Sequence, residues 1–300
     1  MLAAVIFDRA LLRSRQRRAE RQGAATFLLD RVAEDMGDRL AVVLRKFDRA
    51  ADIGTPTDAV RRALAANESI GTLVAARPQF ATAKFENGPV VVGDEEALPF
   101  GAGTLDLAVS ALALQSVNDL PGVMIQIRRA LKPDGLFLAA LFGGETLTEL
   151  RDSLFTAEVE IEGGASPRVA PFTEVRAAGA LLQRAGFALP VADVDRVIVR
   201  YDSLFALAAD LRRMGATNPL ADRRRIPLRR ATLRRAAEIY AERYTDHDGR
   251  VRATFDIVWL SGWAPHESQQ QPLKPGSART RLADALRTRE LPAGEKTGGS

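Results

Sequence analysis

The sequence predicts an α/β fold that is built on a mainly parallel β-sheet. From about residue 50 onward, short apolar runs bounded by turn residues alternate with segments of helical periodicity, which is typical of βαβ units. Two of these runs, residues 105–110 and 136–142, are apolar on both faces, as central parallel strands covered by helices should be. With 300 residues and 46% hydrophobic content, the chain is long enough to bury a substantial core.

The predicted elements follow in order along the chain. Residues 8–22 and 24–46 predict two helices that break at Gly23, because apolar side chains recur in the second at helical spacing. Strands are expected at residues 50–53, 70–75, 90–92, 105–110 and 136–142, with helices between them at about 57–66, 119–131 and 146–160. The second half predicts helices near 173–185, 203–214 and 229–244, a strand-pair signal at 191–201 and a last long strand at 251–262.

This order divides the chain into three regions. Residues 1–47 form N-terminal helices, residues 48–268 form the α/β domain with a helical insertion at about 203–244, and residues 269–300 form a flexible tail. The tail is expected to be flexible because Gln, Pro and Gly replace the large apolar side chains that a packed segment needs.

The composition excludes several classes of site and partner. The absence of cysteine excludes disulfides, thiolate metal sites and cysteine nucleophiles. The two histidines, His247 and His266, lie in separate segments; an iron site with Asp248 and Glu267 is the less favoured reading, and we predict no metal. No apolar stretch could span a membrane and no signal peptide is recognised, so we expect a cytoplasmic protein. The 42 basic and 38 acidic side chains give a net charge of only +4, which does not indicate a nucleic acid partner.

One segment, residues 212–235, concentrates nine arginines. Such a run could dock an acidic partner or nucleic acid. The favoured alternative is a solvated helical face on which the arginines pair with neighbouring acids of the same segment.

Three neighbouring motifs point to a cofactor crevice. The run Val90-Val-Val-Gly-Asp-Glu-Glu96 is followed by Leu98-Pro-Phe100, Leu105-Asp-Leu107 and Leu131-Lys-Pro-Asp-Gly135. This succession resembles the class I methyltransferases that use S-adenosylmethionine. The resemblance implies that Asp94 or Glu95 offers a carboxylate to the adenine amino group, since acids at the carboxyl end of a strand lie in the ligand crevice of such sheets. The alternative is that these acids only start a turn.

Longer strings narrow the resemblance to one family. They include Phe142-Gly-Gly-Glu-Thr-Leu147, Met214-Gly-Ala-Thr-Asn218 and Gly262-Trp-Ala-Pro-His-Glu-Ser-Gln269. These strings resemble the methyltransferase-like assembly factors of respiratory complex I, with the malonyl-carrier-protein methyltransferases as more distant relatives. The resemblance implies a Rossmann-like class I methyltransferase fold, with a seven-stranded, mostly parallel sheet whose last strand is antiparallel. It also implies a methyltransferase-like domain at 48–268, a helical cap over the substrate side of the crevice, and a protein substrate such as a complex I subunit.

The resemblance also assigns site residues. At the cofactor, S-adenosylmethionine, it places Asp52, Gly54, Thr55, Asp94, Glu95, Ser110 and Ala111. On the substrate side it places Gln115, Asn118 and Asp119. No catalytic residue is assigned, because methyl transfer depends mainly on the alignment of the two reacting groups.

The sequence departs from the family pattern at the cofactor. The first loop, Asp52-Ile-Gly54-Thr-Pro56-Thr-Asp58, has only one of the three glycines of the pattern Asp-x-Gly-x-Gly-x-Gly, and Pro56 removes an N–H donor. No acid for the ribose occurs between Ile70 and Phe85, where Arg77 stands instead, and the pair Gln115-Ser116 replaces the usual aromatic residue. The main hypothesis is therefore an S-adenosylmethionine-dependent methyltransferase acting in complex I assembly. The alternatives are a non-catalytic assembly module and an arginine hydroxylase on the same fold.

Overall fold

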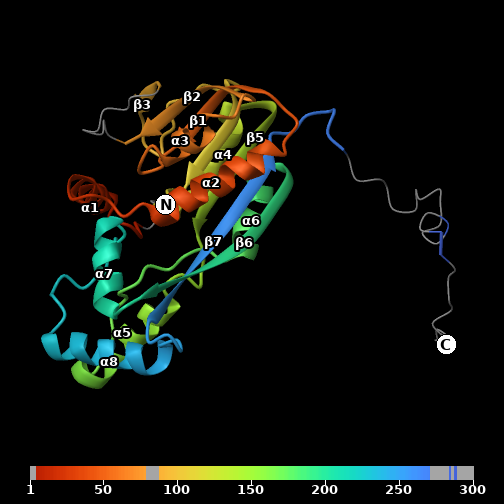
Figure 1. Cartoon of the computed structure of the whole chain (residues 1–300). Helices are drawn as coiled ribbons and strands as arrows, with labels where there is room; N and C mark the ends of the chain where they lie inside the picture. Colours follow the sequence, from red (N-terminus) through yellow and green to blue (C-terminus); the bar gives the residue numbers. More distant parts are fainter. Residues whose placement is uncertain (1–4, 79–87, 271–283, 285–286, 289–300) are drawn as a thin grey trace, which may run out of the picture. The chain divides into compact units, whose positions relative to one another are not determined.

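The computed structural model describes residues 5–78, 88–270, 284, 287 and 288. Its centre is a seven-stranded sheet in the order β3-β2-β1-β4-β5-β7-β6 (Figure 1). The strands are β1 (Phe47–Ile53), β2 (Ile70–Arg77), β3 (Val90–Val92), β4 (Leu105–Ala111), β5 (Leu131–Phe142), β6 (Ala188–Tyr201) and β7 (Val251–Trp263). The first five are parallel, and β7 is antiparallel to both β5 and β6, which confirms the predicted sheet.

The helices follow the predicted order. They are α1 (Arg9–Arg21), α2 (Phe27–Ala41), α3 (Ala59–Leu64), α4 (Leu120–Ala130), α5 (Thr148–Glu162), α6 (Val175–Arg184), α7 (Leu204–Arg213) and α8 (Arg230–Tyr244), with a short 3-10 turn at Leu114–Ser116. Gly23 separates α1 from α2 with a φ of +82°, a backbone conformation that favours glycine. None of the helices in the described part of the chain is long and apolar enough to cross a membrane.

Two apolar layers enclose the sheet because alternate residues of each strand face opposite sides. In β5, Leu136 and Leu138 pack with α2, α3 and α5, whereas Phe137 and Leu141 pack with α4 and α6. Figure 1 shows α2 across the sheet and the long β6–β7 pair running toward α5, α7 and α8. The central strands therefore need no polar face, which explains their unbroken apolar sequence.

Two local expectations differ from the structure. The strand β5 begins at Leu131, which pairs with Leu105, and a bulge separates this pair from that of Leu107 with Leu136. The strand-pair signal at 191–201 corresponds to the single strand β6, whose partner is β7. In both cases the partner strand lies far along the chain, so the local sequence could not specify it.

By its internal contacts the chain divides into two units, Met1–His266 and Glu267–Ser300. The N-terminal helices belong to the first unit together with the sheet. The expected flexible tail at 269–300 falls almost entirely outside the described residues and stays a prediction.

The buried end of β7 offers a test of the packing. Trp259 is 2% exposed, and the guanidinium of Arg39 lies 4.3 Å from the centre of its ring. Replacing a large buried aromatic side chain by alanine leaves a cavity, so we expect Trp259→Ala to lower the free energy of unfolding by about 3–5 kcal/mol. Urea unfolding followed by circular dichroism measures this loss. Phe155→Ala, at an exposed position of α5, should change stability by no more than about 0.5 kcal/mol, and an equal loss in both variants would contradict the packing.

Candidate functional site

The described residues line a cavity of about 560 Å³ at the carboxyl ends of the parallel strands. Its floor includes Gly54 after β1, Leu112 after β4 and Phe142 at the end of β5, and its walls come from α1, α2, α5 and α7. The strand order reverses between β1 and β4, which is the position where open α/β sheets bind ligands. The cavity therefore lies where the sequence placed the crevice.

The first loop is tied to β4 by buried hydrogen bonds beneath the cavity. The Thr55 hydroxyl donates to Asp52 Oδ1 and accepts from the Ala111 N–H at 3.1 Å, and the Ser110 hydroxyl donates to the Ile53 carbonyl at 2.7 Å. Asp52, Ser110 and Ala111 are thus brought together, but they do not line the cavity; Gly54 and Thr55 do. The structure therefore gives Asp52, Ser110 and Ala111 a positioning role.

The backbone around this loop has the left-handed conformation at two points. Gly54 has a φ of +74°, and Leu112, which is not glycine, has a φ of +49°. A Cβ atom added to Gly54 would lie 2.7 Å from Glu95 Cγ, so glycine is required both for the dihedral angle and for the approach of this acid. The strained residue Leu112 lines the cavity, where such strain often accompanies function.

The acidic turn after β3 holds two arginines of α1. The Arg9 guanidinium pairs with Asp94 at 2.6 Å, with Glu96 at 2.8 Å and with Glu95, and Arg13 pairs with Asp94 at 2.6 Å. Burial alone would raise the pKa of Asp94, but hydrogen bonds from Arg13, the Glu96 N–H and Arg9 hold it below its usual value. Of the two carboxylates assigned to adenine, Glu95 lines the cavity and Asp94 does not.

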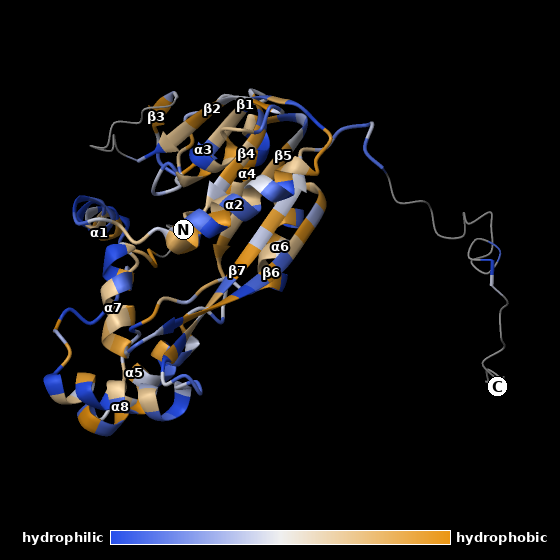
Figure 2. Cartoon of the chain, in the orientation of Figure 1, coloured by the Kyte–Doolittle hydropathy of each residue, from blue (hydrophilic) through white to orange (hydrophobic). Residues whose placement is uncertain are grey.

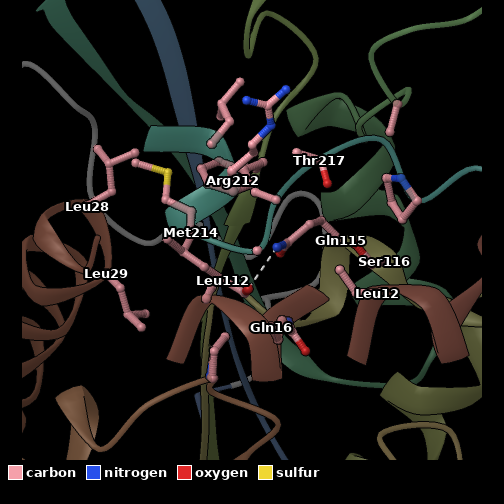
Figure 3. A pocket seen from close by; sticks show the side chains of 18 of the residues that line it. Leu12, Gln16, Leu28, Leu29, Leu112, Gln115, Ser116, Arg212, Met214 and Thr217 are labelled. Atoms are coloured by element: carbon pink, nitrogen blue, oxygen red, sulfur yellow. Dashed lines mark hydrogen bonds between the residues drawn. The ribbon is translucent and has the colours of Figure 1, made fainter. Parts of the chain in front are cut away.

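The substrate-side residues separate into three different roles. Gln115 lines the cavity; its Nε2 donates to the Leu112 carbonyl at 2.7 Å, and its buried Oε1 has no hydrogen-bond partner among the described residues (Figure 3). Asn118 instead accepts from the Ile6 and Phe7 N–H groups, both at 2.8 Å, and so fastens the segment before α1. Asp119 caps α4 by accepting from the Gly122 N–H at 2.9 Å. Only Gln115 is placed to contact a ligand in the cavity.

Arg77 reaches the cavity from the end of β2, where relatives place an acid for the ribose. Its guanidinium donates to the carbonyl oxygens of Thr57 and Pro56, and burial lowers its pKa. An arginine offers donors only, so it cannot accept hydrogen bonds from ribose hydroxyls as a carboxylate would. The residues present thus fit S-adenosylmethionine at Gly54 and Glu95 but not at the ribose.

The N-terminal helices contribute to the cavity, which was not predicted from the sequence. Leu12 and Gln16 of α1 and Leu28 and Leu29 of α2 line it, and Met214 after α7 lies beside Leu28 (Figure 3). The sequence feature that could have indicated this contribution is the opposite charge of the arginine-rich first helix and the acidic run at 94–96. The two segments are more than eighty residues apart, so nothing local shows that they pair. The expected cap is confirmed for α7, which supplies Ala208, Leu211 and Arg212. Within the described ranges, no three His, Asp or Glu side chains form a group that could hold a metal ion.

Comparison with known proteins identifies the family. Residues 51–139 match the family model described as a methyltransferase domain. The chain is 41% identical to the human protein named arginine-hydroxylase NDUFAF5, mitochondrial, over 97% of this chain and 87% of that one. Its zebrafish counterpart (Danio rerio) is 39% identical over 95% and 91%. The chain belongs to the NDUFAF5 family.

More distant similarities place this NDUFAF5 relative within a larger group. A malonyl-[acyl-carrier protein] O-methyltransferase of Laribacter hongkongensis is 36% identical over 64% of this chain and 62% of that one. The solved structure of the YcgJ protein from Bacillus subtilis superposes with a TM-score of 0.52 at 15% identity, covering 78% of this chain and 98% of that one. Together with the matching domain model, this confirms the class I methyltransferase fold expected from the sequence.

The ion pairs of Arg9 provide a test of how α1 is held. Replacing Arg9 by methionine keeps an unbranched apolar stem but removes the guanidinium, which leaves the three carboxylates without their shared cation. Because these groups are only partly buried, we expect Arg9→Met to lower the free energy of unfolding by about 1–2 kcal/mol and to speed amide exchange in α1. Hydrogen exchange read by mass spectrometry measures the second effect. Arg31→Met, at an exposed pair with Asp35, should leave α1 unchanged, and equal exchange in both variants would reject this role for Arg9.

Asp52 gives a pH-dependent test of the first loop. Burial raises the pKa of Asp52 to about 6, against the hydrogen bond from Thr55 and the charges of Arg77 and Arg61. The unfolded chain ionises this group near pH ~4, so between about pH 4 and 6 the folded state binds the proton more tightly and stability falls as the pH rises. Asp52→Asn should therefore gain stability relative to the native protein by about 1.4 kcal/mol per pH unit across this window.

Asp94→Asn is the control of opposite sign. Since the pKa of Asp94 is lowered in the folded state, its stabilising effect is present above the unfolded pKa and is lost as the pH falls through the folded one. Thermal unfolding of the native protein, Asp52→Asn and Asp94→Asn is measured from about pH 3 to pH 8, a range that includes the reference pKa of aspartate near 4. The two variants should differ from the native protein with opposite dependence on pH. A pH-independent difference between Asp52→Asn and the native protein would contradict the raised pKa.

Proposed function

We propose that this chain is an enzyme that hydroxylates an arginine side chain of a protein substrate during the assembly of respiratory complex I. The observation that carries the proposal is the identity of about two residues in five, over nearly the whole chain, with proteins named arginine-hydroxylase. This proposal replaces methyl transfer, the main hypothesis from the sequence, with one of its alternatives. The cytoplasmic location expected from the sequence stays a prediction, and the named relatives are mitochondrial.

The cavity has features that suit an arginine side chain. A guanidinium is recognised by carboxylates, and the acidic turn at 94–96 already binds the guanidinium groups of Arg9 and Arg13 in the structure. Glu95 of this turn lines the cavity, as does Glu20 of α1. The apolar floor formed by Leu112, Phe142 and their neighbours would accommodate the methylene groups of the same side chain.

Hydroxylation needs an oxidant and a reductant in addition to the protein substrate. Hydroxylation converts a C–H bond into a C–OH bond; with dioxygen as oxidant it consumes two electrons and two protons, and the second oxygen atom leaves as water. The residues described above would bind and orient the arginine and exclude water from it. The experiment must supply the oxidant and the reductant.

A second candidate function is methyl transfer from S-adenosylmethionine. It is favoured by the methyltransferase domain match at 51–139 and by the position of the cavity at the switch point of the sheet. Gly54, Glu95 and Gln115 would hold the cofactor, which supplies an electrophilic methyl group when bound. Pro56 and Arg77 count against it, since both remove groups that the cofactor would use.

The proposal is tested in cells that lack the gene. We expect mass spectrometry of their complex I subunits to show one arginine that is lighter, by the mass of one oxygen atom, than in the native strain. Re-expression of the native chain should restore the oxygen atom, whereas Glu95→Gln should reduce its incorporation at least about tenfold, the equivalent of 1.4 kcal/mol in the transition state. Asp119→Asn, which alters only a helix cap, is the matched control.

Two other results of this experiment would support methyl transfer or a non-catalytic assembly role instead. A difference equal to one methylene group would establish methyl transfer and overturn the hydroxylase proposal. If Glu95→Gln restored complex I without any arginine modification, the chain would be a non-catalytic assembly module.

A further inference from the structure

The structure divides the arginines of the 212–235 run into two groups. Five of them pair with carboxylates: Arg213 with Asp210, Arg223 with Asp8, Arg224 with Glu162, Arg234 with Glu238, and Arg235 with Glu160. Arg213, Arg234 and Arg235 thus pair with neighbouring acids as the sequence predicted. Arg223 and Arg224 pair with acids of distant segments, which the sequence did not predict. The other four make no ion pair or side-chain hydrogen bond with any described residue; they are Arg212, Arg225, Arg229 and Arg230.

The last turns of α1 carry three more arginines that have no ion pair with a described residue. Arg17, Arg18 and Arg21 are exposed and have no ion-pair partner among the described residues. The two sets meet at the cavity, because Arg17, Arg21 and Arg212 all line it. Two hydrogen bonds fix this arrangement: the Ala25 N–H donates to the Arg213 carbonyl at 3.1 Å, and the Arg213 side chain donates from Nε to the Gly23 carbonyl at 3.2 Å. We call Arg17, Arg21 and Arg212 the arginine rim.

The loop that leads from α7 to α8 extends the same cationic surface. Leu228 of this loop lines the cavity, and Arg225, Arg229 and Arg230 are exposed around it. Ile226, between them, is 65% exposed and so presents an apolar side chain to solvent. Figure 2 shows α1 predominantly in the hydrophilic colour, and Figure 1 shows α1, α7 and this loop on one side of the sheet. The opening thus has a cationic border with one apolar contact point.

Like charges that face one opening repel each other unless a partner of opposite charge binds there. Other exposed arginines of the described residues, such as Arg129 and Arg176, also lack an ion pair, but at the rim three such arginines border one cavity. Glu20, which lines the same cavity, offsets one of these charges, so net positive charge remains there for a partner. A concave cavity behind the rim, lined by Leu28, Leu29 and Met214, suits an inserted side chain better than a planar lipid surface. These features favour a polypeptide partner.

We propose that the arginine rim is a docking surface for an acidic segment of the protein substrate, on either side of the arginine that enters the cavity. The inference rests on the proposed function in one respect, namely that the substrate is a protein. Carboxylates of the segment pair with Arg17, Arg21 and Arg212, and an apolar residue of the segment contacts Ile226. The positive rim attracts the segment, while the carboxylates Glu20 and Glu95 receive its arginine.

The test measures binding without turnover on the full chain. The probe is a fluorescent peptide in which glutamates and leucines flank one arginine, and its reference is the same peptide with glutamine in place of each glutamate. The triple variant Arg17→Ser, Arg21→Ser and Arg212→Ser should bind the acidic probe at least about tenfold more weakly at low salt, and the glutamine peptide should bind native protein and variant alike. The native affinity should also fall steeply as salt is raised.

A matched control makes the same change of charge elsewhere. Arg129, Arg176 and Arg184 are exposed, have no ion pair with a described residue, and lie on α4 and α6, on the other face of the sheet from α2. Their triple serine variant should bind the acidic peptide as the native protein does. Equal weakening in the two triple variants would show a general effect of net charge and overturn the proposal.

Competition distinguishes the other partners. If anionic phospholipid vesicles or a single-stranded RNA displaced the acidic peptide from the native protein, and bound more tightly through the same three arginines, the polypeptide assignment would be wrong. Weaker binding in the rim variant with no arginine modification in cells would reject the proposed hydroxylation and keep the docking surface. Unchanged peptide binding in the rim variant would reject the docking surface whatever the activity.

Discussion

The site depends on one guanidinium, that of Arg9, which lies between three carboxylates of the turn after β3. This contact joins the first helix of the chain to the edge of the sheet and so completes the wall of the cavity. It also fixes Glu95 against Gly54, where no side chain other than hydrogen could be accommodated. A ligand that needs these carboxylates, whether an adenine amino group or a substrate guanidinium, must compete with α1 or bind beside it. The N-terminal helix is therefore part of the site and not an appendage to the domain.

The altered first loop has a consistent physical explanation. In place of the glycines that would let a cofactor approach the backbone, the loop has Pro56, and Arg77 donates to the carbonyls of Pro56 and Thr57. Below it, Thr55 bridges Asp52 and the start of the turn after β4. The protein thus satisfies the polar backbone groups of this loop with its own side chains. This substitution agrees with a family whose named members carry out another reaction on the same fold.

The sequence predicted the strands well because that information is local, whereas the seven-stranded arrangement with an antiparallel last strand was implied by the family resemblance. Apolar runs such as 136–142 specify a buried strand wherever they occur, and the glycine, proline and acid signals mark the turns. The site was predicted only in part, because its polar contacts join distant segments. Nothing near Asn118 in sequence shows that it fastens Ile6 and Phe7, and nothing near Arg9 shows that its partners lie at 94–96. Asp119 was assigned to the substrate although its spacing before Pro121 is also that of a helix cap, which is what it forms.

The proposed docking surface also depends on contacts between distant segments, so the number of charged residues in the sequence does not indicate it. A net charge of +4 on 300 residues describes a nearly balanced protein, and a run of nine arginines within 212–235 is compatible with a solvated face. The fold decides which of these arginines have acids within reach, and it leaves Arg212 beside Arg17 and Arg21 of a helix that is almost two hundred residues away in sequence. Two basic segments that are unremarkable separately become one cationic border because α1 is held over the cavity, by Arg9 together with Arg13, Asn118 and the contacts to Arg213. The acidic turn that anchors α1 and the arginine rim that α1 contributes are thus coupled, and a partner that loosened the first contact would also rearrange the second.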